Sequence, residues 1–261
     1  MPVTSKEWDC LISQWKDWQT APCARLRYST SRLNIARHVG DPPLRVLDVG
    51  GGNGVDAIYY AEQGHSVTLV DASEAMLAEA RKGAQEHGVP ERLTIRQADA
   101  DAVGGVFGEQ RFDLILGHMM IEFVNDAQGL LREMCNLLAP GGLLSLVDTN
   151  RYSDPYVKAF PPGGGNLADA LKAVGTREYF HPWVNRLTPR FSADEFIDQL
   201  QPNGCALAGH YGIACLCYYL PNERKSDPRY FAELEQLEYR LTDTYPYYLL
   251  ARFFQIVARR E

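Results

Sequence analysis

The sequence predicts an α/β fold, built on a doubly wound, mostly parallel sheet with helices on both faces. Three observations lead to this prediction. Short runs rich in β-branched and apolar residues alternate with amphipathic helical stretches between positions 44 and 150. A glycine-rich turn directly follows the first of these runs. The chain has 261 residues, 46% of them hydrophobic and 23% charged, which is enough for one sizeable core.

The first part of the chain, 1–40, predicts two helices ahead of the sheet. Thr4 and Glu7 have the spacing of a capping box, and three tryptophans follow at helical intervals. A second helical pattern covers 25–39 and ends at Gly40, before an Asp-Pro-Pro sequence. Two such helices either lie over an active site as a lid or pack against the domain, and both interpretations stay open.

The region 44–150 predicts the parallel part of the sheet. Strands that alternate with helices form right-handed crossover units, so consecutive strands run in the same direction. The strands are expected at 45–49, 66–70, 93–97, 112–116 and 143–148, and the helices between them at 56–63, 74–87 and 128–138.

The α/β rhythm ends after Asn150. Residues 151–190 are rich in proline, glycine and aromatic side chains, which predicts an insertion after the fifth strand. A second capping box, Ser192 with Glu195, then begins a helix. Two apolar runs around a charged helix complete a seven-stranded, Rossmann-like sheet with an antiparallel C-terminal strand. These runs span 205–220 and 247–258, and the helix spans 228–242.

Composition argues against several classes of protein. The net charge of −7 and the pI near 5.4 disfavour general polyanion binding, since nucleic-acid binders usually present a basic face. No run approaches the roughly 18 apolar residues of a membrane span. The polar N-terminus, 1–7, is unlike a secretion signal, so no membrane partner and a cytoplasmic location are expected.

The six cysteines do not form the paired ligand sets of a zinc site. We expect buried free thiols, with Cys215 and Cys217 on alternate faces of a strand, and no metal site. The others are Cys10, Cys23, Cys135 and Cys205.

The glycine-rich turn is the strongest functional signal. Its glycines follow G-x-G-x-G spacing at Gly50, Gly52 and Gly54, whereas a dinucleotide site needs G-x-G-x-x-G. The turn lets a ligand lie against backbone N–H groups, but this spacing disfavours a pyrophosphate. Asp71 ends the second strand, where a carboxylate can accept hydrogen bonds from both hydroxyls of a ribose.

Two more features lie farther along the chain. The third strand leads into Ala98 and Asp99, where an acid can meet an adenine amino group, and a Leu-Ala-Pro-Gly-Gly sequence leads into the fifth strand. In this order and spacing, the features resemble class I S-adenosylmethionine-dependent methyltransferases over 44–150. The resemblance implies S-adenosyl-L-methionine as cofactor. The residues implied to hold it are Gly50, Gly51, Gly52, Gly54, Asp71, Ala72, Ala98 and Asp99.

Further matching stretches lie at 44–73, 116–118 and 122–124, and in a C-terminal part with Leu234-Glu235, Leu237-Glu238, Arg240, Pro246-Tyr247 and Arg252. Through them the chain resembles, over most of its length, the bacterial tRNA carboxymethoxyuridine carboxyl-methyltransferases. This resemblance implies that Arg27 contacts the cofactor's carboxylate and that His118 lies at the cofactor pocket. Two departures argue against a tRNA substrate. A lysine-rich stretch of that group is absent near 179–190, and a His-Asp-Tyr triplet reads Cys-Tyr-Tyr at 217–219. Lost phosphate contacts weaken binding to a nucleic acid.

Methyl transfer requires in-line alignment of nucleophile, methyl group and sulfur, and a general base only for a protonated acceptor. His118 follows the fourth strand and is expected as base or cofactor contact, with a packed, hydrogen-bonded histidine as the alternative. Tyr219 is a second catalytic candidate. Further acceptor contacts are expected in the insertion, where loop packing is the alternative role. They are Tyr179, His181, Trp183 and Arg186.

We therefore expect a methyltransferase that acts on a small-molecule acceptor, in specialised metabolism. The insertion carries a dispersed net charge of +3 and many aromatic residues, which suits an enclosed pocket better than a phosphate track. The alternatives are a tRNA wobble-uridine carboxyl methyltransferase, another reaction that consumes S-adenosylmethionine, and a non-catalytic cofactor-binding protein. The expected organisation is one domain, 1–261, with N-terminal helices (1–40), a cofactor-binding core (44–150), an acceptor-side insertion (151–190) and C-terminal helices with a hairpin (191–261).

Overall fold

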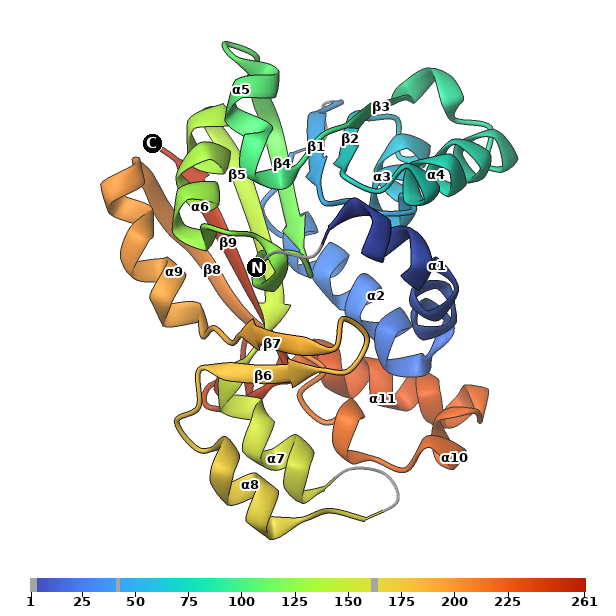
Figure 1. The fold of residues 1–261 in the computed structure, drawn as a ribbon, viewed down its shortest axis with the longest axis vertical. Coiled ribbons are helices and arrows are strands. Elements are labelled where there is room, and N and C mark those ends of the chain that lie inside the picture. The colour runs from blue at the N-terminus through green and yellow to red at the C-terminus, as the bar shows by residue number, and fades with distance from the viewer. Residues whose placement is uncertain (1–3, 41–42, 161–163) are drawn as a thin grey trace.

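The computed structural model describes residues 4–40, 43–160 and 164–261. The first residues of the polar N-terminus, the Asp-Pro pair after Gly40 and part of the proline- and glycine-rich run after Phe160 lie outside the described residues. Figure 1 shows a central sheet with helices on both sides and the insertion below it.

In the described ranges, seven strands form one sheet in the order β3-β2-β1-β4-β5-β9-β8. The first five strands are parallel, and β9 is antiparallel to both of its neighbours. This confirms the predicted Rossmann-like sheet with its antiparallel C-terminal strand. The strands are β1 (Arg45–Val49), β2 (Ser66–Asp71), β3 (Leu93–Gln97), β4 (Phe112–His118), β5 (Leu138–Thr149), β8 (Cys205–Ile213) and β9 (Phe253–Arg260).

Two apolar layers hold helices against the sheet because successive strand residues face opposite sides. Val46 packs with one helical layer and Leu47 with the other, and both are fully buried. The first layer contains α2 (Pro22–Ala36), α3 (Val55–Glu62) and α4 (Glu74–Glu86); the second contains α5 (Val103–Phe107), α6 (Ala127–Leu137) and α9 (Ala193–Leu200).

The sheet reverses its order between β1 and β4, and a ligand of such a fold binds at the carboxyl ends of these strands. The N-terminal helix α1 (Ser5–Thr20) lies beside this edge (Figure 1). Its capping box forms as predicted. Asp9 joins α1 to the start of α4 by accepting a 2.6 Å hydrogen bond from the Ser73 hydroxyl, and Lys16 pairs with Glu79 at 2.6 Å.

The insertion contains two short helices and a hairpin that the sequence did not predict. The helices are α7 (Asp154–Ala159) and α8 (Leu167–Ala173), and the hairpin pairs β6 (Glu178–His181) with β7 (Arg186–Pro189). After β8 the chain forms α10 (Asn222–Lys225) and α11 (Pro228–Leu241), which pack beside α2 before β9 returns to the sheet.

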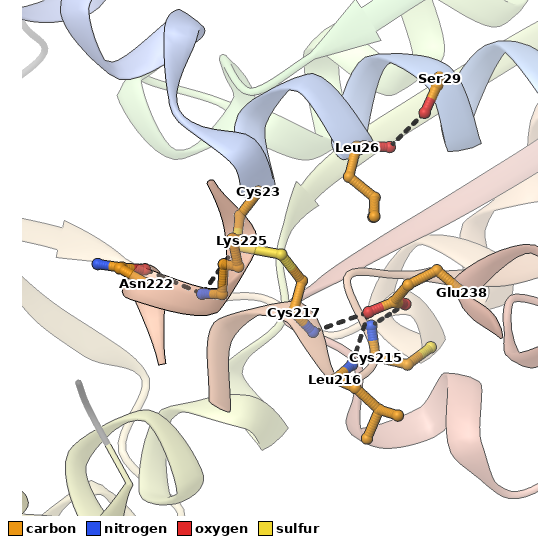
Figure 2. The surroundings of a disulfide bond; sticks show 9 residues. All are labelled: Cys23, Leu26, Ser29, Cys215, Leu216, Cys217, Asn222, Lys225 and Glu238. Carbon is orange, nitrogen blue, oxygen red and sulfur yellow. Dashed lines mark hydrogen bonds between the residues drawn. A yellow bond between two sulfur atoms is a disulfide. The ribbon is translucent and has the colours of Figure 1, made fainter. Parts of the chain in front are cut away.

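The expectation of only free thiols is wrong for two of the cysteines. Cys23 of α2 and Cys217 form a disulfide across 194 residues of sequence (Figure 2). Such a distance along the chain leaves no local signal to predict the pairing. Cys215 and Cys217 also lie beyond the end of β8, because Ala214 has a left-handed φ of +56° and turns the chain out of the strand. Cys10 is exposed rather than buried.

No helix in the described part of the chain is long and apolar enough to cross a membrane.

Candidate functional site

The glycine turn closes tightly over a buried carboxylate. Gly50, Gly52 and Gly54 have left-handed φ values of +66°, +55° and +81°, which other residues rarely adopt. A Cβ atom on Gly51 would lie 2.6 Å from Oδ2 of Asp48, a clash that requires the loop to move. Asp48 is only 3% exposed, and its burial raises its pKa well above the usual range. The turn therefore needs glycine for both backbone conformation and space.

This close approach leads to a prediction for Gly51→Ala. The added methyl group meets the Asp48 carboxyl and, at 3.0 Å, Cγ of the core residue Leu69. Overpacking of this kind costs about 1–3 kcal/mol of folding free energy. We expect a lower midpoint in thermal unfolding and weaker binding of S-adenosylhomocysteine. Gly105→Ala is the matched control because a Cβ there has no atom within 4 Å; equal stability of the two variants would contradict the prediction.

Asp71 fixes the shape of the glycine turn from the end of β2. Its Oδ2 accepts a 2.9 Å hydrogen bond from the Gly52 amide, and its Oδ1 accepts one of 2.9 Å from Ser73. Burial raises the pKa of Asp71, although these amide donors oppose the shift. Each carboxylate oxygen retains a second lone pair, so the side chain can still accept hydroxyl donors from a ligand.

A hollow of about 750 Å³, here named the glycine-loop pocket, opens where the carboxyl ends of the strands meet. It brings together six of the predicted cofactor residues, with aromatic side chains of α1 and methionines after β4. Its lining is Trp8, Trp15, Gly50, Gly52, Asp71, Ala72, Met76, Asp99, Ala100, His118, Met119, Met120, Phe123 and Val124. Gly51 and Arg27 line an adjoining recess of about 320 Å³. Ala98 and Gly54 line neither hollow.

Arg27 is a buried cation with unused hydrogen-bonding capacity. It is 2% exposed, and its Nε and Nη1 atoms have no hydrogen-bond partner among the described residues. Its guanidinium lies 3.9 Å from the centroid of the Tyr28 ring. A buried charge without an anion is unfavourable. The recess beside the glycine turn thus fits the carboxylate of an amino-acid-bearing cofactor, which would satisfy these donors.

His118 belongs to a chain of buried hydrogen bonds behind the pocket. Its Nδ1 lies 3.2 Å from Oδ2 of Asp56 and its Nε2 lies 2.9 Å from Oγ of Ser145. Ser145 accepts a 3.0 Å hydrogen bond from Gln255, so its own proton can be donated to Nε2. This pattern places the histidine proton on Nδ1, where it is donated to Asp56. Asp56 in turn pairs with Arg32 at 2.8 Å.

These contacts define what His118 can do. Burial lowers its pKa despite the nearby Asp56 carboxylate, so the ring is neutral near pH 7. Both ring nitrogens are engaged by protein groups, which disfavours the expected role as a base. His118 nevertheless lines the glycine-loop pocket. A role in shaping the cofactor site therefore agrees better with the geometry.

A second hollow of about 680 Å³, here named the arginine cavity, adjoins the first. Four residues line both hollows: Trp8, Trp15, Met119 and Phe123. The other lining residues of the arginine cavity are Trp18, Glu122, Thr149, Tyr179, His181, Pro182, Trp183, Arg190, Tyr218, Arg252 and Phe253. Tryptophans from α1 and Trp183 from the β6–β7 hairpin meet here, with ring centroids of Trp15 and Trp183 6.2 Å apart.

Two buried arginines give the arginine cavity its polar character. Arg190 pairs with Glu122 and Asp154, and Arg252 pairs with Asp154 at 2.8 Å. The Nε atoms of both arginines lack a hydrogen-bond partner in the described structure. Burial and these two cations lower the pKa of His181 to about 4. His181 is thus neutral near pH 7, and its buried Nδ1 also has no described partner.

The structure separates the predicted acceptor contacts. Tyr179, His181 and Trp183 line the arginine cavity together. Arg186 instead forms an ion pair with Glu7, which links the hairpin to α1. Tyr219 lines neither hollow, and its hydroxyl donates to the Leu250 carbonyl at 3.4 Å.

Several residues that line the arginine cavity were not predicted as acceptor contacts, and they include Tyr218, Glu122, Arg190 and Arg252. The triplet at 217–219 predicts a tyrosine at the acceptor site, and the structure places Tyr218 rather than Tyr219 in the cavity wall. Tyr218 enters the cavity because the chain forms a single 3₁₀ turn, Cys217–Tyr219, and directs consecutive side chains differently. The buried arginines could not be predicted locally, because Arg190 pairs with Glu122 and Arg252 pairs with Asp154, which lie far away in the sequence.

Among the residues that the structure describes, no three His, Cys, Asp or Glu side chains are grouped to hold a metal ion. Metal independence stays a prediction, and activity that survives treatment with EDTA would support it.

Comparison with known proteins gives a consistent pattern. A family model for a methyltransferase domain matches residues 46–142. The chain is 32% identical over 226 residues to a tRNA 5-carboxymethoxyuridine methyltransferase of Escherichia coli strain K12, with 87% of this chain and 84% of that protein covered. It is 34% identical over 189 residues to a ubiquinone biosynthesis O-methyltransferase of Ruegeria pomeroyi, with 70% of each chain covered.

Solved structures show the same fold. Magnesium protoporphyrin IX methyltransferase from Synechocystis PCC 6803, solved with bound S-adenosylhomocysteine, matches with a TM-score of 0.59 and 18% identity. The match covers 96% of this chain and 94% of that one.

Proposed function

Because this chain belongs to the class I S-adenosylmethionine-dependent methyltransferases, we propose that it transfers a methyl group to a small-molecule acceptor bound in the arginine cavity. The observation that carries the proposal is the shared wall of the two hollows. A cofactor in the glycine-loop pocket and an acceptor in the arginine cavity would meet at Trp8, Trp15, Met119 and Phe123. Adjacent, preformed sites supply the alignment that methyl transfer requires.

S-Adenosylmethionine supplies an electrophilic methyl group on a sulfonium. In the proposal, Arg27 binds its carboxylate, the glycine turn and Asp71 hold its ribose, and Asp99 faces its adenine. The aromatic side chains of α1 exclude water from the shared wall. In this proposal the helices of 1–40 close the site, and the core of 44–150 binds the cofactor. The insertion, 151–190, forms the outer wall of the acceptor site.

The chemistry of the arginine cavity favours a planar acceptor with a polar or anionic substituent. Aromatic rings cover much of its wall, and such surfaces bind flat, conjugated molecules. The Nε atom of Arg252 has no hydrogen-bond partner in the described structure and can donate to an oxygen of the substituent, and neutral His181 can accept from a hydroxyl or N–H group. An ionised oxygen needs no general base, while a protonated one would use a group such as His181.

The cations of the insertion argue against a phosphate track. Most already pair with carboxylates of the protein, which leaves few of them for nucleic-acid phosphates. The pairs are Arg151 and Arg177 with Glu195, Lys172 with Asp169, Arg186 with Glu7, and Arg190 with Glu122. Lys158 lies 5.2 Å from the centroid of the Tyr179 ring.

The second candidate is carboxyl methylation of a modified uridine in tRNA. It is favoured by the 32% identity to the Escherichia coli tRNA 5-carboxymethoxyuridine methyltransferase. The two arginines of the cavity would also suit a carboxylate on a nucleobase. Small metabolites and tRNA both occur in the cytoplasm, which is the compartment that the proposal assumes.

The two acceptors can be distinguished by following labelled methyl groups. Purified protein with methyl-labelled S-adenosylmethionine is offered a low-molecular-weight cell extract or bulk tRNA. We expect label in the small-molecule fraction and negligible tRNA binding in a gel-shift assay at physiological salt. Submicromolar, salt-sensitive tRNA binding with label in a uridine would reverse the assignment. Arg27→Met serves as the control for label that does not depend on the cofactor site.

A further inference from the structure

One loop beside the arginine cavity is held by a buried carboxylate from a different element. Glu238 of α11 is 1% exposed, and its Oε2 accepts a 2.7 Å hydrogen bond from the amide of Cys215. Its Oε1 accepts the amides of Leu216 at 2.9 Å and Cys217 at 2.7 Å (Figure 2). The left-handed φ of Ala214 directs these three consecutive N–H groups to one side. The loop thus forms a concave nest of donors that Glu238 fills.

The same loop has two further attachments. The disulfide joins Cys217 to Cys23 on α2, one helical turn before Arg27. On the other side, the amide of Arg252 donates a 3.2 Å hydrogen bond to the carbonyl of Ala214. The Glu238 carboxylate, the disulfide and the Arg252 amide therefore each hold the loop 214–217.

This loop leads directly into the wall of the arginine cavity. Tyr218 follows Cys217 and lines the cavity together with Arg252 and Phe253. Its ring centroid lies 5.7 Å from that of Phe253 in an edge-on contact, and the Arg252 guanidinium lies 5.5 Å from the same ring. Glu238 itself lines neither hollow, so it can affect the cavity only through the loop.

We infer that Glu238 is a positioning residue for acceptor binding: it fixes loop 214–217 and thereby sets the orientation of Tyr218 in the cavity wall, with the Cys23–Cys217 disulfide as a second brace. The inference rests on the proposed function, because it takes the arginine cavity as the acceptor site. A carboxylate suits the nest because it only accepts hydrogen bonds, whereas glutamine would place an N–H₂ group against amide donors.

The variant Glu238→Gln tests this role against a matched control. Glu235→Gln changes the same helix and neutralises a carboxylate that accepts a 2.7 Å hydrogen bond from the Ser29 hydroxyl of α2, away from the loop. In Glu238→Gln we expect amide hydrogen exchange in 214–220 to become about tenfold faster, in line with the loss of a charge-assisted hydrogen bond. S-Adenosylhomocysteine affinity should stay within about twofold of wild type, and Glu235→Gln should match wild type in both measurements.

A kinetic readout separates positioning from general destabilisation. Initial rates of label transfer are measured over dilutions of the low-molecular-weight extract, or of tRNA where tRNA is the acceptor. For Glu238→Gln the half-saturating amount of acceptor should rise about tenfold, with a smaller change in maximal rate. Cys217→Ser, which removes the disulfide, should also raise the half-saturating amount of acceptor. This variant provides a second test if Glu238→Gln does not fold.

The outcomes are distinct. Unchanged exchange in 214–220 and an unchanged half-saturating amount in the folded variants would overturn the inference. A large loss of S-adenosylhomocysteine affinity in Glu238→Gln would also contradict it, because the effect would then not be confined to the acceptor side. Where the wild type transfers label to neither acceptor, the proposed function fails, while the exchange comparison still decides whether Glu238 braces the loop.

Discussion

Replacement of Arg27 by methionine is expected to remove most of the affinity for S-adenosylhomocysteine while the cofactor-free protein stays as stable as wild type or becomes more stable. The buried Nε and Nη1 atoms of Arg27 have no hydrogen-bond partner among the described residues. Loss of this cation therefore removes a desolvation penalty from the folded state. The unbranched methionine retains part of the packing against Tyr28 and Trp18.

The expected loss of binding is large because the cofactor's carboxylate would be left buried without its partner. Truncation of one member of a buried charge pair costs about 2–5 kcal/mol, or roughly 30-fold to several thousand-fold in affinity. Titration calorimetry measures the affinity, and thermal unfolding without ligand measures the stability.

Arg32→Met is the matched control for Arg27→Met. Arg32 pairs with the buried Asp56, so its loss leaves that carboxylate with the neutral His118 as hydrogen-bond partner and without this ion pair, which should destabilise the cofactor-free protein. A destabilised Arg27→Met protein that binds S-adenosylhomocysteine as tightly as wild type would exclude the assigned contact.

Asp71→Ala is expected to weaken S-adenosylhomocysteine binding by about 1.5–3 kcal/mol, or roughly 10- to 150-fold. The change removes the proposed acceptor for the ribose hydroxyls, and it also frees the amides of Gly52 and Ser73. Asp113→Ala is the control, since that carboxylate pairs with Arg45 at the opposite end of the sheet.

The ribose contact can be separated from the effect on the loop with a ligand that lacks a ribose hydroxyl. 2′-Deoxy-S-adenosylhomocysteine should bind more weakly than the parent compound to wild type, and the difference should shrink in Asp71→Ala. Equal differences in both proteins would show that Asp71 acts only on the glycine turn.

Much of the cofactor side could be predicted because its signals are local. The glycine turn, Asp71 and the third strand's acid each follow a strand within a few residues. Parallel strands bring their carboxyl ends to one edge, so residues far apart in the chain converge without any knowledge of side-chain packing. The structure accordingly places Gly50, Asp71 and Asp99 around one pocket.

The acceptor side was less accessible to prediction. Three expected aromatic contacts line the cavity, but Arg186 pairs with Glu7, and Tyr218 rather than Tyr219 faces inward. A helix or strand has a fixed side-chain period, whereas the loop after β8 has none. In such a loop the sequence does not show which of two adjacent tyrosines faces the cavity, so the prediction was off by one residue.

The Rossmann-like sheet, the glycine turn and the carboxylate at the tip of β2 follow from local sequence patterns, because hydrophobic periodicity and glycine geometry act over neighbouring residues. Which distant groups meet depends on tertiary packing. Tertiary packing joins Cys23 to Cys217, brings three amides from another element to Glu238, and buries Arg27 with two donor atoms that have no described hydrogen-bond partner. The physical reason is that burial and pairing of charges depend on contacts between elements far apart in sequence, and the chain's local pattern carries no record of those contacts.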